Sequence, residues 1–90
     1  MSETITKLEQ ALTSLNPDFV DIQDDSAHHA GHAGNTGGGH YTVTIISDVF
    51  TNLPLIKRHR LVYEAAKTLM VKDIHALSID AKTPAETSWN

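Results

Sequence analysis

The chain has 90 residues, a formal net charge of −4 at pH 7 and no cysteine. This length supports one small hydrophobic core, so we expect a single domain over residues 1–90, and the lack of cysteine excludes disulfides and any metal site in which this chain supplies sulfur. No apolar run approaches the roughly 20 residues that span a bilayer, and the N-terminus lacks the regions of a signal peptide, so we expect a soluble cytoplasmic protein that does not bind membranes.

The first predicted elements are a helix and a short strand. Four apolar residues recur at spacings of 3, 4 and 3, as on the buried face of a helix over residues 4–15: Ile5, Leu8, Leu12 and Leu15. Asn16-Pro17 ends this helix, because the residue before a proline disfavours helical backbone. Residues 19–24 are predicted to form a strand.

A glycine- and histidine-rich segment follows. All five glycines lie between Gly31 and Gly39, and four of the six histidines lie in or beside this run: His28, His29, His32 and His40. Glycine permits positive φ, and imidazole is a common metal ligand, so the segment is a candidate metal site. The equal alternative is a solvated connection whose histidines bind nothing, since the segment lacks the H-E-x-x-H motif of a helical zinc-protease site. We expect residues 28–39 to be the least ordered internal segment.

A second strand and a second helix come next. The strand, over residues 41–47, is rich in β-branched residues and has Tyr41, Val43 and Ile45 on one face. The helix, over residues 54–70, is predicted from a stripe of buried apolar residues. That stripe consists of Leu55, Val62, Ala66 and Leu69.

The third strand is predicted over residues 74–80, with His75, Leu77 and Ile79 on one side, and Thr83–Glu86 begin a short final turn or helix. The order α-β-β-α-β gives an α+β fold, in which a three-stranded mixed sheet carries both helices on one face. A helical crossover makes the second and third strands parallel, so their first residues lie at one end of the sheet. We therefore expect His40 and His75 to be close together.

The basic residues are clustered on an otherwise acidic chain. Lys57, Arg58 and Arg60 lie close together in the second helix, which suits one local anionic partner better than a length of phosphate backbone. His59 lies among them, and the more ordinary interpretation is a histidine at the edge of the core. Gly31–Gly34 matches the GxxG pattern of KH domains, but it joins two strands rather than two helices. The chain has no motif of a nucleophilic or nucleotide-binding enzyme, so we expect no enzymatic activity.

Several short motifs, in this order, together resemble the BolA family. They are Asp24-Asp25-Ser26, His29-Ala30-Gly31-His32-Ala33-Gly34, Gly39-His40-Tyr41, Arg58-His59-Arg60-Leu61-Val62-Tyr63, Ile74-His75-Ala76-Leu77 and Thr83-Pro84. The resemblance covers nearly the whole chain, and the fold that it implies is the class II KH-like arrangement.

The resemblance also implies a function. BolA-like proteins pair with monothiol glutaredoxins of the CGFS type and share with them a two-iron two-sulfur cluster, which the glutaredoxin cysteine and glutathione hold from the other side. The family pattern implies His75 as one ligand and a residue of the segment before the second strand as the other. His29, His32 and His40 match family positions, with a slight preference for His32. The chain would then be a monomer alone and a heterodimer with glutaredoxin, docking through Lys57, Arg58, His59 and Arg60.

A second function is compatible with the same resemblance. Some family members are reported to resemble DNA-binding transcriptional regulators, and the basic patch of Lys57, Arg58 and Arg60, together with Lys67, would supply the contacts for such a role. The acidic net charge and the five aromatic residues of the whole chain favour the adaptor over the regulator.

Overall fold

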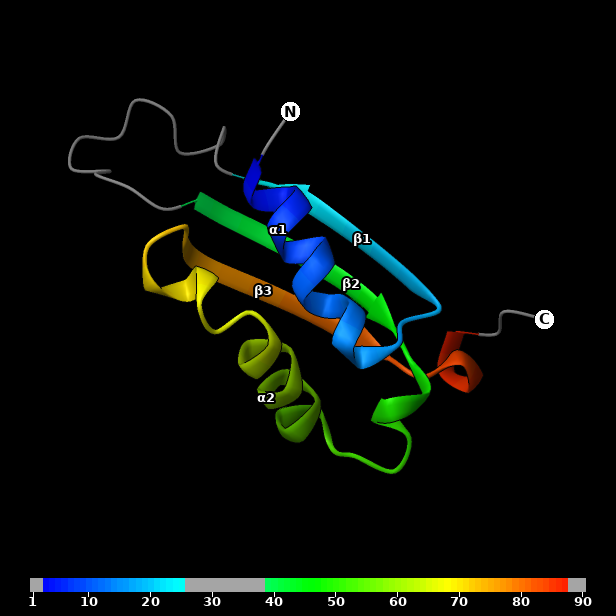
Figure 1. Cartoon of the computed structure of the whole chain (residues 1–90). Helices are drawn as coiled ribbons and strands as arrows, with labels where there is room; N and C mark the ends of the chain where they lie inside the picture. Colours follow the sequence, from blue (N-terminus) through cyan, green and yellow to red (C-terminus); the bar gives the residue numbers. More distant parts are fainter. Residues whose placement is uncertain (1–2, 26–38, 88–90) are drawn as a thin grey trace.

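The computed structural model describes residues 3–25 and 39–87. It contains a three-stranded sheet in the order β1-β2-β3, with β1 (Phe19–Asp24) antiparallel and β3 (Ile74–Lys82) parallel to the central strand β2 (Gly39–Ile46). Two helices, α1 (Glu3–Leu12) and α2 (Leu55–Ala65), lie on one face of this sheet (Figure 1). The predicted α+β fold and the parallel pairing are confirmed. Neither helix described here has the length and apolar character that crossing a membrane requires.

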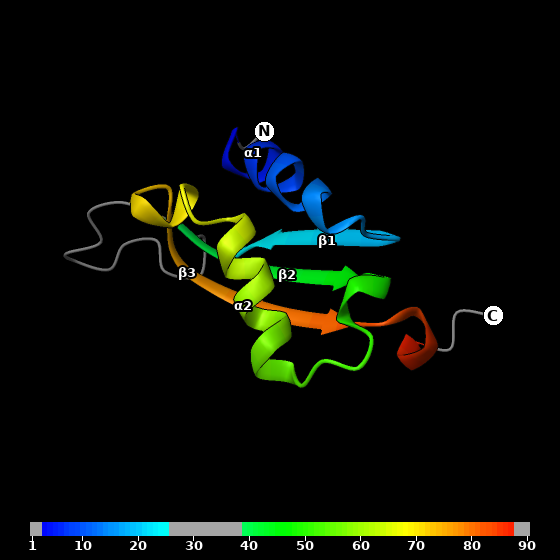
Figure 2. The same cartoon turned by 60° about the horizontal axis from the view of Figure 1, so that its bottom comes forward.

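Short 3-10 helices complete the chain. They follow α1 at Thr13–Leu15, follow β2 at Asp48–Phe50, follow α2 at Leu69–Val71, and end the described chain at Pro84–Thr87. The last of these confirms the predicted turn at Thr83–Glu86. Figure 2 shows the 3-10 helix after α2 beside the start of β3, and the terminal one beyond the other end of that strand.

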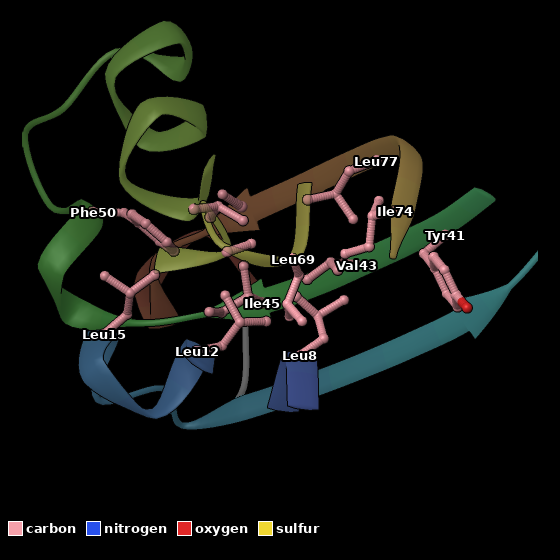
Figure 3. Packing of buried hydrophobic residues seen from close by; sticks show 13 residues of the cluster. Leu8, Leu12, Leu15, Tyr41, Val43, Ile45, Phe50, Leu69, Ile74 and Leu77 are labelled. Carbon is pink, nitrogen blue, oxygen red and sulfur yellow. The ribbon is translucent and has the colours of Figure 1, made fainter. Parts of the chain in front are cut away.

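The core lies between the sheet and the two helices. Tyr41, Val43 and Ile45 of β2 are buried together, as predicted from alternation, and Leu8 and Leu12 of α1 pack into the same cluster (Figure 3). Alternate residues of a strand face opposite sides of the sheet, so the residues between these three face away from the helices. We call that side the open face.

Several boundaries and faces differ from the predictions: the helix expected over residues 4–15 ends at Leu12 and is followed by a 3-10 helix, and β3 extends to Lys82. Strand β2 begins at Gly39, so His40 belongs to the sheet and not to the segment before it. Helix α2 ends at Ala65, and the predicted helix to residue 70 is divided into an α-helix and a 3-10 helix. Leu55 is 62% exposed, so its place in the buried stripe was wrong; Arg58, one turn later, faces inward instead. The predicted mobility of residues 28–39 concerns residues outside the described part, apart from Gly39.

Candidate functional site

Strands β2 and β3 both start at the same end of the sheet (Figure 1). Two histidines meet there. The imidazole rings of His40 and His75 have their centroids 5.2 Å apart and are inclined by 37°. His75 is exposed and His40 is partly buried, so the pair lies at the surface. The expected proximity of these two residues is confirmed.

An irregularity in the pairing of β2 with β3 brings the two rings together. Gly39 pairs with Ile74 and His40 pairs with Ala76, so His75 is an extra residue on β3, as in a β-bulge. Because the residue after His40 is the buried Tyr41, His40 projects on the open face, and the ring contact places His75 there too. The prediction that grouped His75 with Leu77 and Ile79 on one side was therefore wrong, since the bulge reverses the alternation.

Strand β1 approaches this pair from the other side of β2. Its last residue, Asp24, pairs with Tyr41, which places the next residue, Asp25, opposite His40. The backbone N–H of Asp25 donates to the carbonyl oxygen of His40 at 2.7 Å. The hydroxyl of Thr42 donates to Asp25 Oδ2 at 2.5 Å, so the carboxylate lies on the open face.

The donor set suits a metal that accepts neutral nitrogen ligands. Two imidazoles bound at about 2.0–2.1 Å to one tetrahedral ion have ring centroids about 5 Å apart, close to the observed spacing. Among residues 3–25 and 39–87, no group of three or more histidine, aspartate or glutamate side chains could hold a metal ion. The described residues thus supply two nitrogen ligands, and other ligands must come from elsewhere. His29 and His32 lie outside the described residues.

The basic cluster of α2 is divided between the surface and the interior. Lys57 and Arg60 are exposed and His59 is partly buried, whereas Arg58 is only 7% exposed. The expectation that Arg58 forms a surface patch with Lys57 and Arg60 therefore needs correction. Its inward direction follows from the helical period, because Arg58 lies four residues before the buried Val62.

Arg58 is engaged inside the chain. Its guanidinium donates to Glu86 Oε1 at 2.6 Å and to Glu86 Oε2 at 3.0 Å, to the Ala81 carbonyl at 3.1 Å and to the Leu53 carbonyl at 2.8 Å. Glu86 also accepts from the Thr83 backbone N–H at 2.9 Å. The hydrogen bond from Arg58, and then that from Thr83, lowers the pKa of Glu86 to about 2. The pairing therefore anchors the C-terminal turn to α2 and β3.

Comparison with known proteins places the chain in a family. The model of the family described as BolA-like protein matches residues 11–86. The chain is 43% identical over 86 residues to SufE-like protein 1 of Arabidopsis thaliana, covering 89% of this chain and 22% of that protein. It is 40% identical over 84 residues to mouse BolA-like protein 1, covering 93% of this chain and 58% of that one. The solved BolA domain of Arabidopsis SufE1 has a TM-score of 0.83 at 39% identity, covering 96% of this chain and 98% of that domain.

The chain belongs to the BolA family. It spans from about a fifth to about three fifths of the length of the two curated relatives named above, so its likeness to them concerns the BolA domain.

Within this BolA domain, two residues of the Arg-His-Arg-Leu-Val-Tyr motif donate side-chain hydrogen bonds to β3, while Val62 of the same motif is buried in the core. Strand β3 is at the edge of the sheet, and its Ala81 carbonyl accepts from Arg58 while its Leu77 carbonyl accepts from the Tyr63 hydroxyl at 3.0 Å. An unpaired strand edge can template pairing with another chain, so these side chains of α2 protect part of it. This motif thus contributes to the fold through the hydrogen bonds of Arg58 and Tyr63 as well as through the burial of Val62.

Proposed function

We propose that this BolA-family chain is a non-enzymatic adaptor that binds a monothiol glutaredoxin of the CGFS type and shares with it a two-iron two-sulfur cluster. The observation that carries the proposal is the His40–His75 pair, which presents two imidazoles at the surface at a spacing that suits one metal ion. In this assignment both BolA-side ligands are nitrogen, because the chain has no cysteine.

His75 and His40 are the proposed ligands from this chain. His29 and His32 are the alternatives to His40 that family resemblance allows, and substitution decides between them. The glutaredoxin cysteine and its glutathione would hold the other iron. When bound, the cluster supplies an electron-accepting group that can be passed on, and imidazole in place of thiolate raises the potential of such clusters, as in Rieske centres.

The partner would dock against the exposed basic residues of α2. Lys57 and Arg60 are exposed there, beside the partly buried His59, and they offer positive charge to an acidic protein or glutathione surface. Arg58 is left out of this docking surface, because its guanidinium is held by Glu86.

The alternative function, DNA-binding transcriptional regulation, has lost support. With Arg58 inside the fold, the exposed candidate contacts are Lys57, Arg60 and Lys67, and the open face carries Asp21, Asp25 and Asp80, the last of them paired with Lys82. A measured salt dependence separates the two functions, because binding through many phosphate contacts weakens steeply as salt concentration rises and a small protein interface weakens less.

The test is reconstitution of the mixed cluster. The purified chain is mixed with a cluster-loaded monothiol glutaredoxin, and the visible circular dichroism spectrum is recorded for the wild type and for His75→Ala, His40→Ala, His32→Ala and His29→Ala. We expect His75→Ala and His40→Ala to abolish or alter the mixed spectrum and His32→Ala and His29→Ala to leave it intact; the reverse result for His32 or His29 would make that histidine the second ligand. His28→Ala, which removes a histidine that does not match the family pattern, is recorded as the control and should also leave the spectrum intact. A wild-type spectrum in His75→Ala would refute the assignment.

A further inference from the structure

We propose that Asp25 is a positioning residue for the histidine pair: its hydrogen bonds to His40 and Thr42 hold the start of β2 in the register that places the His40 imidazole beside His75. This inference deepens the proposed function and rests on it for its biological meaning. The geometry itself is a property of the metal-free chain and can be tested there.

The first support is the position of Asp25 relative to His40. The two residues are opposite each other across the antiparallel pair of β1 and β2, directly after the end of β1 at Asp24. Their backbones are joined by the bond from Asp25 N–H to the His40 carbonyl at 2.7 Å. Side chains opposite each other in such a pair have Cβ atoms about 4.5–5.5 Å apart on the same face. The Asp25 carboxylate therefore flanks the His40 imidazole.

The second support is the direction in which the carboxylate is fixed. Thr42 is two residues after His40 on β2 and shares the open face with it, and its hydroxyl donates to Asp25 Oδ2 at 2.5 Å. This bond runs diagonally across the two strands and sets the rotamer of Asp25. The backbone bond and the side-chain bond together join β1 to β2 at two points next to the histidine.

The third support is that the start of β2 would be weakly held without these two hydrogen bonds. Strand ends open more readily than strand centres, and the residue before His40 is Gly39, which has no side chain to pack. Gly39 is held on the other side by its N–H bond to the Asp73 carbonyl at 3.1 Å, next to the bulge at His75. The ring spacing of 5.2 Å depends on His40 keeping its place between β1 and β3 at once.

The experiment compares the ring contact in the metal-free protein. The nuclear Overhauser effect between the ring protons of His40 and His75 is measured by NMR in Asp25→Ala, Asp25→Asn, Thr42→Val and Thr42→Ser. We expect the Ala and Val variants to lose or strongly weaken the effect while remaining folded, and the Asn and Ser variants, which can still form the side-chain bond, to keep it. Thr44→Val, on the same strand and face but farther from the pair, is the matched control and should also keep it.

Two results would overturn the proposal. One is a wild-type ring contact in both Asp25→Ala and Thr42→Val; the other is an Asp25→Asn variant that loses the contact as fully as Asp25→Ala, since the amide oxygen can replace the carboxylate as acceptor. Residues that orient metal ligands typically change metal affinity by about 10–100-fold, so the Ala and Val variants should need at least about 10-fold more cluster-loaded glutaredoxin to form the mixed species.

The two readouts separate this proposal from the proposed function. If the ring contact responds as expected but His75→Ala keeps the wild-type cluster spectrum, Asp25 positions the pair and the pair is not the cluster ligand. If His75→Ala loses the cluster spectrum but the His40–His75 ring contact is unchanged in the Asp25 and Thr42 variants, the cluster function stands and the positioning role is wrong.

Discussion

Ser47 lies at the end of the sheet opposite the histidine pair, where it joins β2, the 3-10 helix after α1 and the 3-10 helix after β2. Replacing it by alanine should destabilise the protein measurably. The residue is 0% exposed and directly follows β2. Its hydroxyl donates to the Leu15 carbonyl at 2.6 Å, at the end of the 3-10 helix after α1, and accepts from the Val49 N–H at 3.2 Å. Ser47→Ala removes only the oxygen, so the change leaves almost no cavity.

The size of the effect follows from the burial of the acceptor. A net hydrogen bond contributes about 0.5–1.5 kcal/mol, but leaving a buried acceptor without its partner costs about 1–3 kcal/mol. Leu15 is 8% exposed, so water reaches its carbonyl poorly, whereas Val49 is 42% exposed and water can replace the lost partner of its N–H. We therefore expect about 2 kcal/mol, nearly all from Leu15. In a domain of 60–100 residues this lowers Tm by about 8–16 °C.

The assay is urea and thermal unfolding with a matched control. Ser14→Ala removes an exposed hydroxyl that donates to the Ala11 carbonyl at 3.1 Å, and it should change stability by no more than about 0.5 kcal/mol, because water replaces the bond. The m-value should stay the same in all three proteins, which shows that the native state is not otherwise altered. If Ser47→Ala were no less stable than Ser14→Ala, the argument from the buried acceptor would be refuted.

Three further outcomes follow from the site and its supports. Arg58 and Thr83 lower the pKa of Glu86 to about 2, so the ionised carboxylate stabilises the fold fully above its ordinary pKa of 4.5, and this stabilisation is lost as pH falls toward 2. Glu86→Gln should therefore lose less stability than the wild type between pH 5 and pH 3, as measured by denaturant unfolding. Tyr63→Phe should cost about 0.5–1 kcal/mol in the same assay, since the Leu77 carbonyl loses a partner beside a half-exposed ring. The mixed cluster should form less well as pH falls toward about 6, because metal-binding imidazoles must be neutral; visible circular dichroism across a pH series checks this.

Periodicity predicted the parts of the fold that apolar burial dictates. The alternation at Tyr41, Val43 and Ile45 located β2, and the 3, 4, 3 spacing in residues 4–15 located α1. The parallel pairing of β2 with β3 followed from the helical crossover, and it brought His40 and His75 to the same end of the sheet. These features depend on which residues avoid water, and one sequence shows that directly.

Two features of the site could not be predicted from such patterns. A charged residue is normally assigned to the surface, yet Arg58 is inside because Glu86, 28 residues later, supplies a paired carboxylate, and a long-range partner leaves no local signal. The bulge at His75 depends on how two strands that are 35 residues apart align, and alternation within one strand cannot show it. The Asp24-Asp25-Ser26 motif marked Asp25 as notable, but only the register showed that it is opposite His40.

The family motifs therefore divide between the two ends of the sheet. At the end where β3 finishes, Arg58 bonds to Ala81 and to Glu86, and a substitution there removes several hydrogen bonds together. At the end where β3 begins, His75 is exposed and a bulge holds it in place, so its loss should leave the core unchanged. Variants of Arg58 should consequently reduce cluster formation in proportion to the fraction of protein that unfolds. Variants of His75 should reduce it in a protein that stays fully folded, and only that second pattern identifies a ligand.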